Sequence, residues 1–157
     1  MSVYLGYLMR NINITYYIKY INMVDYLDEE EYNRWLSNAK YTLKSSINDK
    51  LSDFYNWACF KAQQAAEYAV KAYLRGIGDD SFGHSVSLLL KKASFDEHVV
   101  NTAKIIDKYY IPTRYTDAWS EGVPEDYYTL DEANEAINCS ETIIDEVENK
   151  WKSLKKE

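Results

Sequence analysis

The stretch that decides the fold is FKAQQAAEYAVKAYLRG, residues 60–76. Alanine recurs through it at helical spacing, so small side chains form one narrow stripe along a predicted helix. The stripe consists of Ala58, Ala62, Ala65, Ala69 and Ala72. A row of small residues lets a neighbouring helix axis approach closely. Gly76 and Gly78 suit a left-handed helix end, so we expect a helix over about residues 53–75 that packs tightly against others.

Helical periodicity continues through the rest of the chain from Asp28 onward. We expect two further helices over about residues 29–47 and 85–93. A fourth helix should begin at a capping box at Ser94–Glu97 and end just before Pro112. The last should begin at a second capping box at Thr129–Glu132 and end at about Trp151. The INDKLSD segment (47–53) is expected to be a polar turn. Nothing predicts a sheet. The predicted fold is all-α: an up-and-down bundle of four to five helices with a long ordered loop before the last helix.

That loop, which begins DKYYIPTRYTDAW at residue 107, is rich in aromatic and acidic side chains. Loops of this length are uncommon in compact domains and are usually functional or disordered. Its many rings argue against disorder. We therefore expect an ordered strap that places Arg114 near a groove. Its rings provide either packing or a platform on which bases stack; they are Tyr109, Tyr110, Tyr115 and Trp119.

The composition suits a single domain that does not bind nucleic acid through its overall charge. The chain has 157 residues and a formal net charge of −7. A polyanion is repelled by such a chain unless it meets a local basic patch. One face of the helix over 53–75 is basic, and its cations either pair with nearby carboxylates or face a phosphate. This face consists of Lys61, Gln64, Tyr68, Lys71 and Arg75.

Few features point to metal or redox chemistry. Cys59 and Cys139 are far apart and are interpreted as reduced core thiols of a cytoplasmic protein. The two histidines have no carboxylate–histidine spacing typical of ligands, so neither a metal site nor a cofactor is predicted. Of these histidines, His98 is expected at the surface, and His84 is either a ligand-binding residue or a helix-start residue bonded to backbone groups.

The first residues differ from the rest. No acidic residue precedes Asp25, and polar residues interrupt the apolar runs, so we predict neither a membrane span nor a signal peptide. Residues 1–26 are interpreted as an appended, weakly ordered arm and 27–155 as the domain. One hypothesis is that translation begins at Met23.

Taken together, four segments resemble the HEPN domain family: FKAQQAAEYAVKAYL (60–74), GHSVSLLL (83–90), DKYYIPTRYTDA (107–118) and YYTLDEANEAI (127–137). They occur in the family's order, and the resemblance covers about residues 27–150. Thr116 departs from the pattern, because family members often have proline there. The resemblance implies a small helical domain that commonly forms homodimers.

The family contains both enzymes and binding modules. Many members are metal-independent ribonucleases with an arginine and a histidine four to six residues apart, which bind the scissile phosphate and move the proton of the 2′-hydroxyl. This chain lacks that spacing: even Arg75 and His84 are separated by eight residues. Other members resemble nucleotide-binding or docking modules and are encoded beside a minimal nucleotidyltransferase, in a toxin–antitoxin-like arrangement.

We therefore predict a non-catalytic, dimeric module that binds a nucleotide or another phosphate-bearing ligand and acts with a nucleotidyltransferase. The predicted ligand-binding residues are Lys71, Arg75, His84, Arg114, Tyr115 and Asp117. The alternatives are a ribonuclease toxin that uses Arg114 and His84 as a displaced pair on RNA, and a scaffolding subunit that docks a basic partner. For Arg114 an ion pair with Asp117, Glu121 or Asp126 is the structural alternative.

Overall fold

The computed structural model describes residues 27–156, so the interpretation of residues 1–26 as an arm, and the start at Met23, lie outside the described residues. The elements are α2 (Glu29–Leu51), α3 (Tyr55–Gly76), α4 (Val86–Lys92), α5 (Glu97–Ile106) and α6 (Leu130–Lys156), with the 3-10 turns η1 (Asp107–Tyr109), η2 (Thr116–Ala118) and η3 (Pro124–Asp126) between α5 and α6. No strand occurs within this range. The predicted all-α bundle with a long structured loop before the last helix is confirmed.

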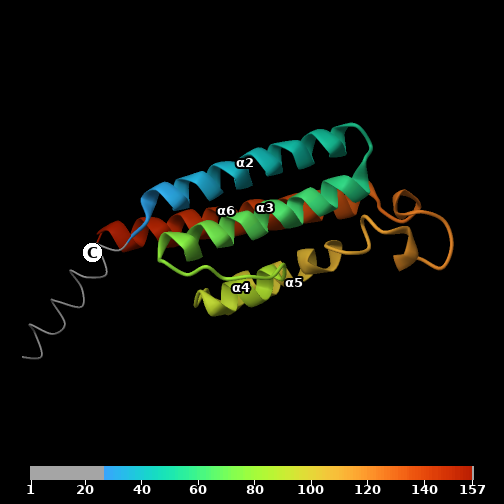
Figure 1. Ribbon diagram of the computed structural model, residues 1–157. Coiled ribbons are helices and arrows are strands. Elements are labelled where there is room, and N and C mark those ends of the chain that lie inside the picture. The colour runs from blue at the N-terminus through green and yellow to red at the C-terminus, as the bar shows by residue number, and fades with distance from the viewer. Residues whose placement is uncertain (1–26, 157) are drawn as a thin grey trace, which may run out of the picture.

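The three long helices α2, α3 and α6 run side by side, and the short pair α4 and α5 lies along the same bundle (Figure 1). Helix α3 contacts each of the other four α-helices. The loop between α5 and α6 lies at one end of the bundle, beside the start of α3 (Figure 1). The loop residues are therefore held next to the first turns of the central helix.

The alanine stripe explains this central position of α3. Each of its five alanines is fully buried, as the sequence predicted. One side of α6 is also buried; it consists of Ala133, Ile137, Ser140, Ile144, Val147 and Trp151. The burial of α3 extends beyond the stripe and includes three polar residues: Asn56, Gln63 and Glu67.

Several helix boundaries differ from the prediction. Helix α5 ends at Ile106 instead of just before Pro112 and is followed by η1, and α6 continues to Lys156. Helix α2 continues to Leu51, and the turn comes later, at Ser52–Phe54, where Asp53 has a φ of 62°. The Ser94–Glu97 capping box is wrong. Ser94 has a φ of 56° and closes the end of α4, where the Phe95 amide donates to the Leu90 carbonyl. Asp96 is the N-cap residue of α5, and its side chain makes no capping hydrogen bond. A left-handed residue is what a helix end commonly requires, and that need overrode the motif.

The second capping box, at Thr129–Glu132, is confirmed. The Thr129 amide donates to the Glu132 carboxylate (2.9 Å), and the Glu132 amide donates to the Thr129 hydroxyl (3.3 Å). Two N–H groups at the start of α6 are thereby satisfied. None of the helices in the described part of the chain has the length and apolar character that crossing a bilayer would require.

Candidate functional site

The loop is fixed to the bundle immediately before Arg114. Thr113 is fully buried, its hydroxyl donates to the Tyr109 carbonyl (2.5 Å), and its own carbonyl accepts from the Asn56 amide at the start of α3 (3.0 Å). Trp119 Nε1 donates to the Pro112 carbonyl at 2.8 Å. Buried polar groups paired in this way specify one backbone path. The position of Arg114 is therefore set by the fold.

The Arg114 guanidinium lies among three aromatic rings. Its Cζ is 4.3 Å from the centroid of Phe60, 4.6 Å from that of Tyr110 and 4.8 Å from that of Tyr115. We call these four residues the Arg114 cluster. Nε and Nη2 both donate to the Tyr110 carbonyl, at 2.9 and 2.6 Å. The ion pair considered for Arg114 is not formed, and no carboxylate within residues 27–156 pairs with it.

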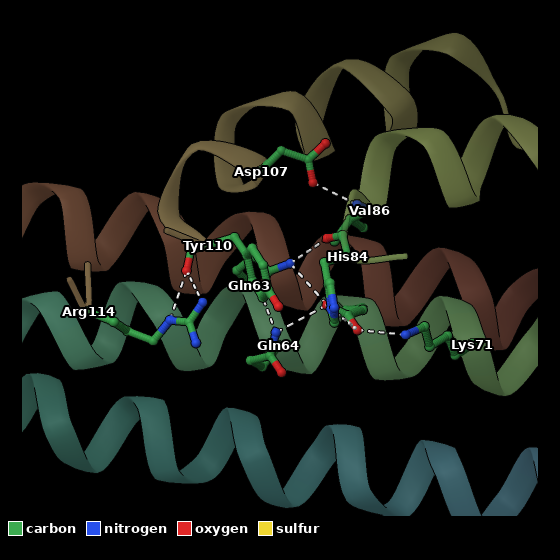
Figure 2. A network of polar contacts seen from close by, with 9 residues as sticks. Gln63, Gln64, Lys71, His84, Val86, Asp107, Tyr110 and Arg114 are labelled. Carbon is green, nitrogen blue, oxygen red and sulfur yellow. Dashed lines mark hydrogen bonds and ion pairs between the residues drawn. The ribbon is translucent and has the colours of Figure 1, made fainter. Parts of the chain in front are cut away.

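His84 joins this cluster through Tyr110. The two rings are stacked, with centroids 4.4 Å apart and an interplanar angle of 15°. Figure 2 shows Arg114 and His84 on opposite sides of Tyr110. The structure thus brings together two of the predicted site residues that are distant in the sequence. The Tyr110 ring separates them, so the imidazole and the guanidinium do not face each other directly.

The imidazole of His84 contacts a carboxylate that the sequence analysis missed. Its Nδ1 lies 3.2 and 3.3 Å from the two oxygens of Glu67, a residue that is only 2% exposed. Glu67 also accepts from Lys71 Nζ (2.8 Å), and from Gln63 and Gln64. We call Gln63, Gln64, Glu67, Lys71 and His84 the Glu67 network (Figure 2). The His84 ring thus contacts a carboxylate side chain, and not backbone groups as in the alternative considered for it.

A second carboxylate holds the residues just after His84. Asp107 accepts from the Ser85 hydroxyl (2.8 Å), the Val86 amide (2.6 Å) and the Ser87 hydroxyl (2.5 Å) and amide (3.2 Å). A carboxylate at a helix N-terminus satisfies free N–H groups and interacts well with the helix dipole. Asp107 therefore ties the start of α4 to η1, and so fixes the backbone on the C-terminal side of His84 (Figure 2).

The other predicted ligand-binding residues are dispersed. Lys71 belongs to the Glu67 network, and Tyr115 is about half exposed (51%) over Arg114. Arg75 lies elsewhere, paired with Asp80 at 3.0 Å and set over the Trp35 ring at 4.5 Å. Asp117 is exposed in η2. His98 is exposed, as expected.

The basic face of α3 is largely neutralised. Lys61 pairs with Asp49 at 2.6 Å, and Lys71 and Arg75 have the carboxylate partners given above. Of the two interpretations of this face, the described contacts favour cations paired with carboxylates. Near it, a surface hollow of about 400 Å³ lies between α2 and α3, lined by Arg34, Trp35, Asn38 and Tyr68.

The two cysteines are buried and unbridged. Burial raises the pKa of the Cys59 thiol to about 12, which leaves almost no thiolate near neutral pH. Across residues 27–156, no group of three or more His, Cys, Asp or Glu side chains is arranged to hold a metal ion.

The chain was compared with known families and proteins. The HEPN domain family model matches residues 32–150. Among solved structures, TT1696 from Thermus thermophilus is similar at 40% identity and a TM-score of 0.73, covering 76% of this chain and 97% of that one. ST0689, described as an archaeal HEPN homologue, is similar at 37% identity and a TM-score of 0.67, with 76% and 96% covered.

A HEPN domain protein from Thermotoga maritima is similar at 33% identity and a TM-score of 0.62, covering 76% of this chain and 98% of that one. The comparison with curated proteins found no match. The family match spans the four segments quoted from the sequence, and it includes both the Arg114 cluster and the Glu67 network. The chain therefore belongs to the HEPN domain family.

Proposed function

We propose that this chain is a non-catalytic HEPN module that binds a nucleotide or another phosphate-bearing ligand at the Arg114 cluster. The observation that carries the proposal is a half-buried guanidinium without a carboxylate partner among residues 27–156. A guanidinium has five N–H donors, and the Tyr110 carbonyl accepts two of them, which leaves three for a ligand. Arginine suits phosphate because its planar fork can donate two parallel hydrogen bonds.

The rings around Arg114 support a ligand that carries a base. Tyr115 is half exposed and lies against the guanidinium, so part of its side chain is accessible to a stacking partner. Stacking a base on an aromatic side chain contributes roughly 1–3 kcal/mol. A guanidinium beside an exposed ring therefore matches a nucleotide better than it matches a bare inorganic anion.

The other cations of the predicted set contribute less to this proposal. Lys71 and Arg75 each have a carboxylate within 3.0 Å, so their charge is compensated. A phosphate that approached either one would have to compete with that carboxylate. We therefore assign the phosphate to Arg114, with His84 as the neighbouring polar side chain on the other side of Tyr110.

The proposal includes a homodimer and a nucleotidyltransferase partner in a toxin–antitoxin-like system, acting in the cytoplasm. Three large apolar side chains near the loop end of the bundle are at least two-fifths exposed, and a second copy could cover them: Phe54 (57%), Trp57 (43%) and Ile111 (50%). Light scattering at several concentrations tests the dimer. A monomer at all of these concentrations would contradict the dimer.

Co-expression with the neighbouring open reading frame, followed by affinity purification, tests the nucleotidyltransferase partner.

Calorimetric titration with ATP, GTP and their monophosphates tests the ligand. We expect binding by the wild type and at least a tenfold weaker Kd for Arg114→Ala. Arg34→Ala is the matched control, because it removes the same charge from α2, where Arg34 is exposed and pairs with Glu31. No detectable heat at millimolar ligand, or equal loss in both variants, would overturn the proposal.

One observation favours a second function, a ribonuclease that uses His84 and Arg114. A carboxylate against Nδ1 is the arrangement that orients a histidine for general base catalysis. Purified wild type and His84→Ala would be incubated with RNA in the presence of a chelator. Cleavage by the wild type that His84→Ala abolishes would establish the enzyme. Equal cleavage, or none, would leave the binding module.

A further inference from the structure

His84 is held by an unusual amount of buried polar structure for an exposed side chain. Its side chain is 54% exposed, yet the groups that hold it are buried: Gln63 fully and Glu67 to within 2%. Gln63 Nε2 also donates to the His84 carbonyl at 2.8 Å, so the same network holds the backbone and the ring. Burying a carboxylate is unfavourable unless its charge and hydrogen bonds are compensated. The direct structural effect of the buried Gln63 and Glu67 side chains is to orient the His84 imidazole.

Glu67 determines which nitrogen of His84 carries the proton. An ionised carboxylate only accepts hydrogen bonds, and here it is paired with the Lys71 ammonium at 2.8 Å. Nδ1, at 3.2 Å from Glu67, must therefore be the donor. The stack with Tyr110 fixes the plane of the ring. Nε2 is the nitrogen left for a ligand.

This tautomer has a consequence for a ligand with more than one phosphate group, since the Tyr110 ring lies between His84 and the phosphate site at Arg114. With Nδ1–H committed to Glu67, the neutral imidazole presents only a lone pair at Nε2, which repels a phosphate oxygen. Nε2 can donate to the phosphate only after it has taken a proton from the solvent. The charged and titratable groups around the ring are Glu67 and Lys71 of α3, Tyr110 and Arg114 of the loop, and Asp107 behind the start of α4.

We propose that Glu67 is a positioning residue for the ligand site, and that through it His84 binds the ligand's phosphate with uptake of one proton. The inference rests on the proposed function, since it needs a phosphate at Arg114. The only covalent change is a proton transfer: the buffer acid loses a proton, an N–H bond forms at Nε2, and Nε2–H then donates to a phosphate oxygen. The second contact to the ligand is therefore present only in the protonated protein.

Calorimetry in two buffers with different ionisation enthalpies measures this proton. Wild-type protein would be titrated with ATP at pH 7.5 in each buffer, and the difference in heat gives the protons taken up per ligand. We expect more uptake than in His84→Gln, in which only the ligand's own protonation changes. Glu67→Gln should reduce the proton uptake that is due to the imidazole at least twofold; this uptake is the difference between the wild type and His84→Gln. His98→Gln is the matched control, and its uptake should equal that of the wild type.

The outcomes separate this inference from the proposed function. Binding with the same proton uptake in wild type and His84→Gln overturns the inference and leaves the proposed function intact. If the wild type does not bind ATP, the proposed contact between His84 and a phosphate is wrong. The role of Glu67 is then still tested by nitrogen NMR. In wild-type protein the His84 imidazole should be protonated at Nδ1 when neutral, with His98→Gln used to identify its signals. A neutral His84 ring protonated at Nε2 would overturn the positioning role of Glu67. This measurement does not require a Glu67 variant, which could fail to fold.

Discussion

The indole of Trp151 occupies the space beside Gly76 that a side chain there would need. A Cβ built on Gly76 would lie 2.5 and 2.6 Å from two carbons of that ring, and 3.1 Å from the Cβ of Tyr32. Trp151 is stacked on Tyr32, with centroids 4.0 Å apart, so the ring has little room to move. Gly76 therefore allows α2, α3 and α6 to meet at this end of the bundle.

Gly76→Ala should destabilise the protein by about 1–3 kcal/mol, because an inserted methyl group displaces a packed ring. The helix propensity of alanine offsets this by less than about 1 kcal/mol. Urea denaturation measures the change. Gly78→Ala is the control: its φ is +82° but nothing lies within 4 Å of the added Cβ, so only backbone strain is introduced. If both variants lose the same free energy, the contact with Trp151 is not the cause.

Ser94→Gly should stabilise the protein by roughly 0.5–1 kcal/mol. Ser94 has a φ of 56°, a conformation that glycine adopts without the strain of a Cβ. The gain is reduced because glycine also increases the freedom of the unfolded chain. Thermal denaturation at one pH measures it. A fall in stability would instead support a capping role for the serine hydroxyl.

Thr113→Val should cost about 1–3 kcal/mol, since the isosteric valine leaves the buried Tyr109 carbonyl without the hydroxyl that donates to it. It should also weaken ligand binding, because the next residue is Arg114. Thr116→Val, at an exposed position of η2, is the control and should change neither property. Denaturation and calorimetry on both variants test this, and a stable Thr113→Val with normal affinity would contradict it.

Alkaline pH should destabilise the protein through a buried group of weak acids. Burial raises the pKa of Cys59 and of Tyr128 each to about 12, and it raises the pKa of Tyr109 even further above the usual tyrosine value. These groups ionise more easily in the unfolded chain, so their contribution is fully present below about pH 9 and is lost as pH rises towards the folded values. The free energy of unfolding should therefore fall between pH 9 and 11.

The control for this prediction is Tyr128→Phe, which removes one of the ionisable groups while keeping the ring. It should lose less stability than the wild type over the same pH range, whatever its stability at pH 8. Tyr41, which is 74% exposed, gives the comparison: Tyr41→Phe should follow the wild-type curve. Parallel curves for Tyr128→Phe and wild type would show that this hydroxyl does not drive the loss.

The sequence predicted those features that depend on neighbours in the chain. The alanine stripe of α3 and the Thr129 capping box are local patterns, and both are present. Ser94 satisfied a local pattern too, but the end of α4 needed a left-handed residue at that position. A motif that fits two roles cannot by itself say which one the neighbouring helix will require.

The site was predicted less completely because it is built from distant segments. Arg114 and His84 could be singled out as residue types, but their meeting on Tyr110 depends on how η1 packs beside α4. Glu67 had one sequence signal, a carboxylate between buried alanines, yet helical periodicity does not say which partner faces it. For the same reason the carbonyl of Tyr110, rather than an acidic side chain, could not be foreseen as the partner of Arg114.

The indole of Trp119 gives the loop an optical probe of its own. Its Nε1 is bonded to the Pro112 carbonyl and its ring is stacked on Tyr127 at 3.9 Å, whereas Trp35, Trp57 and Trp151 belong to the long helices. A variant that retained Trp119 as its sole tryptophan would emit from the loop that carries Arg114. Quenching, lifetime or anisotropy changes could then follow occupancy in real time without any attached dye.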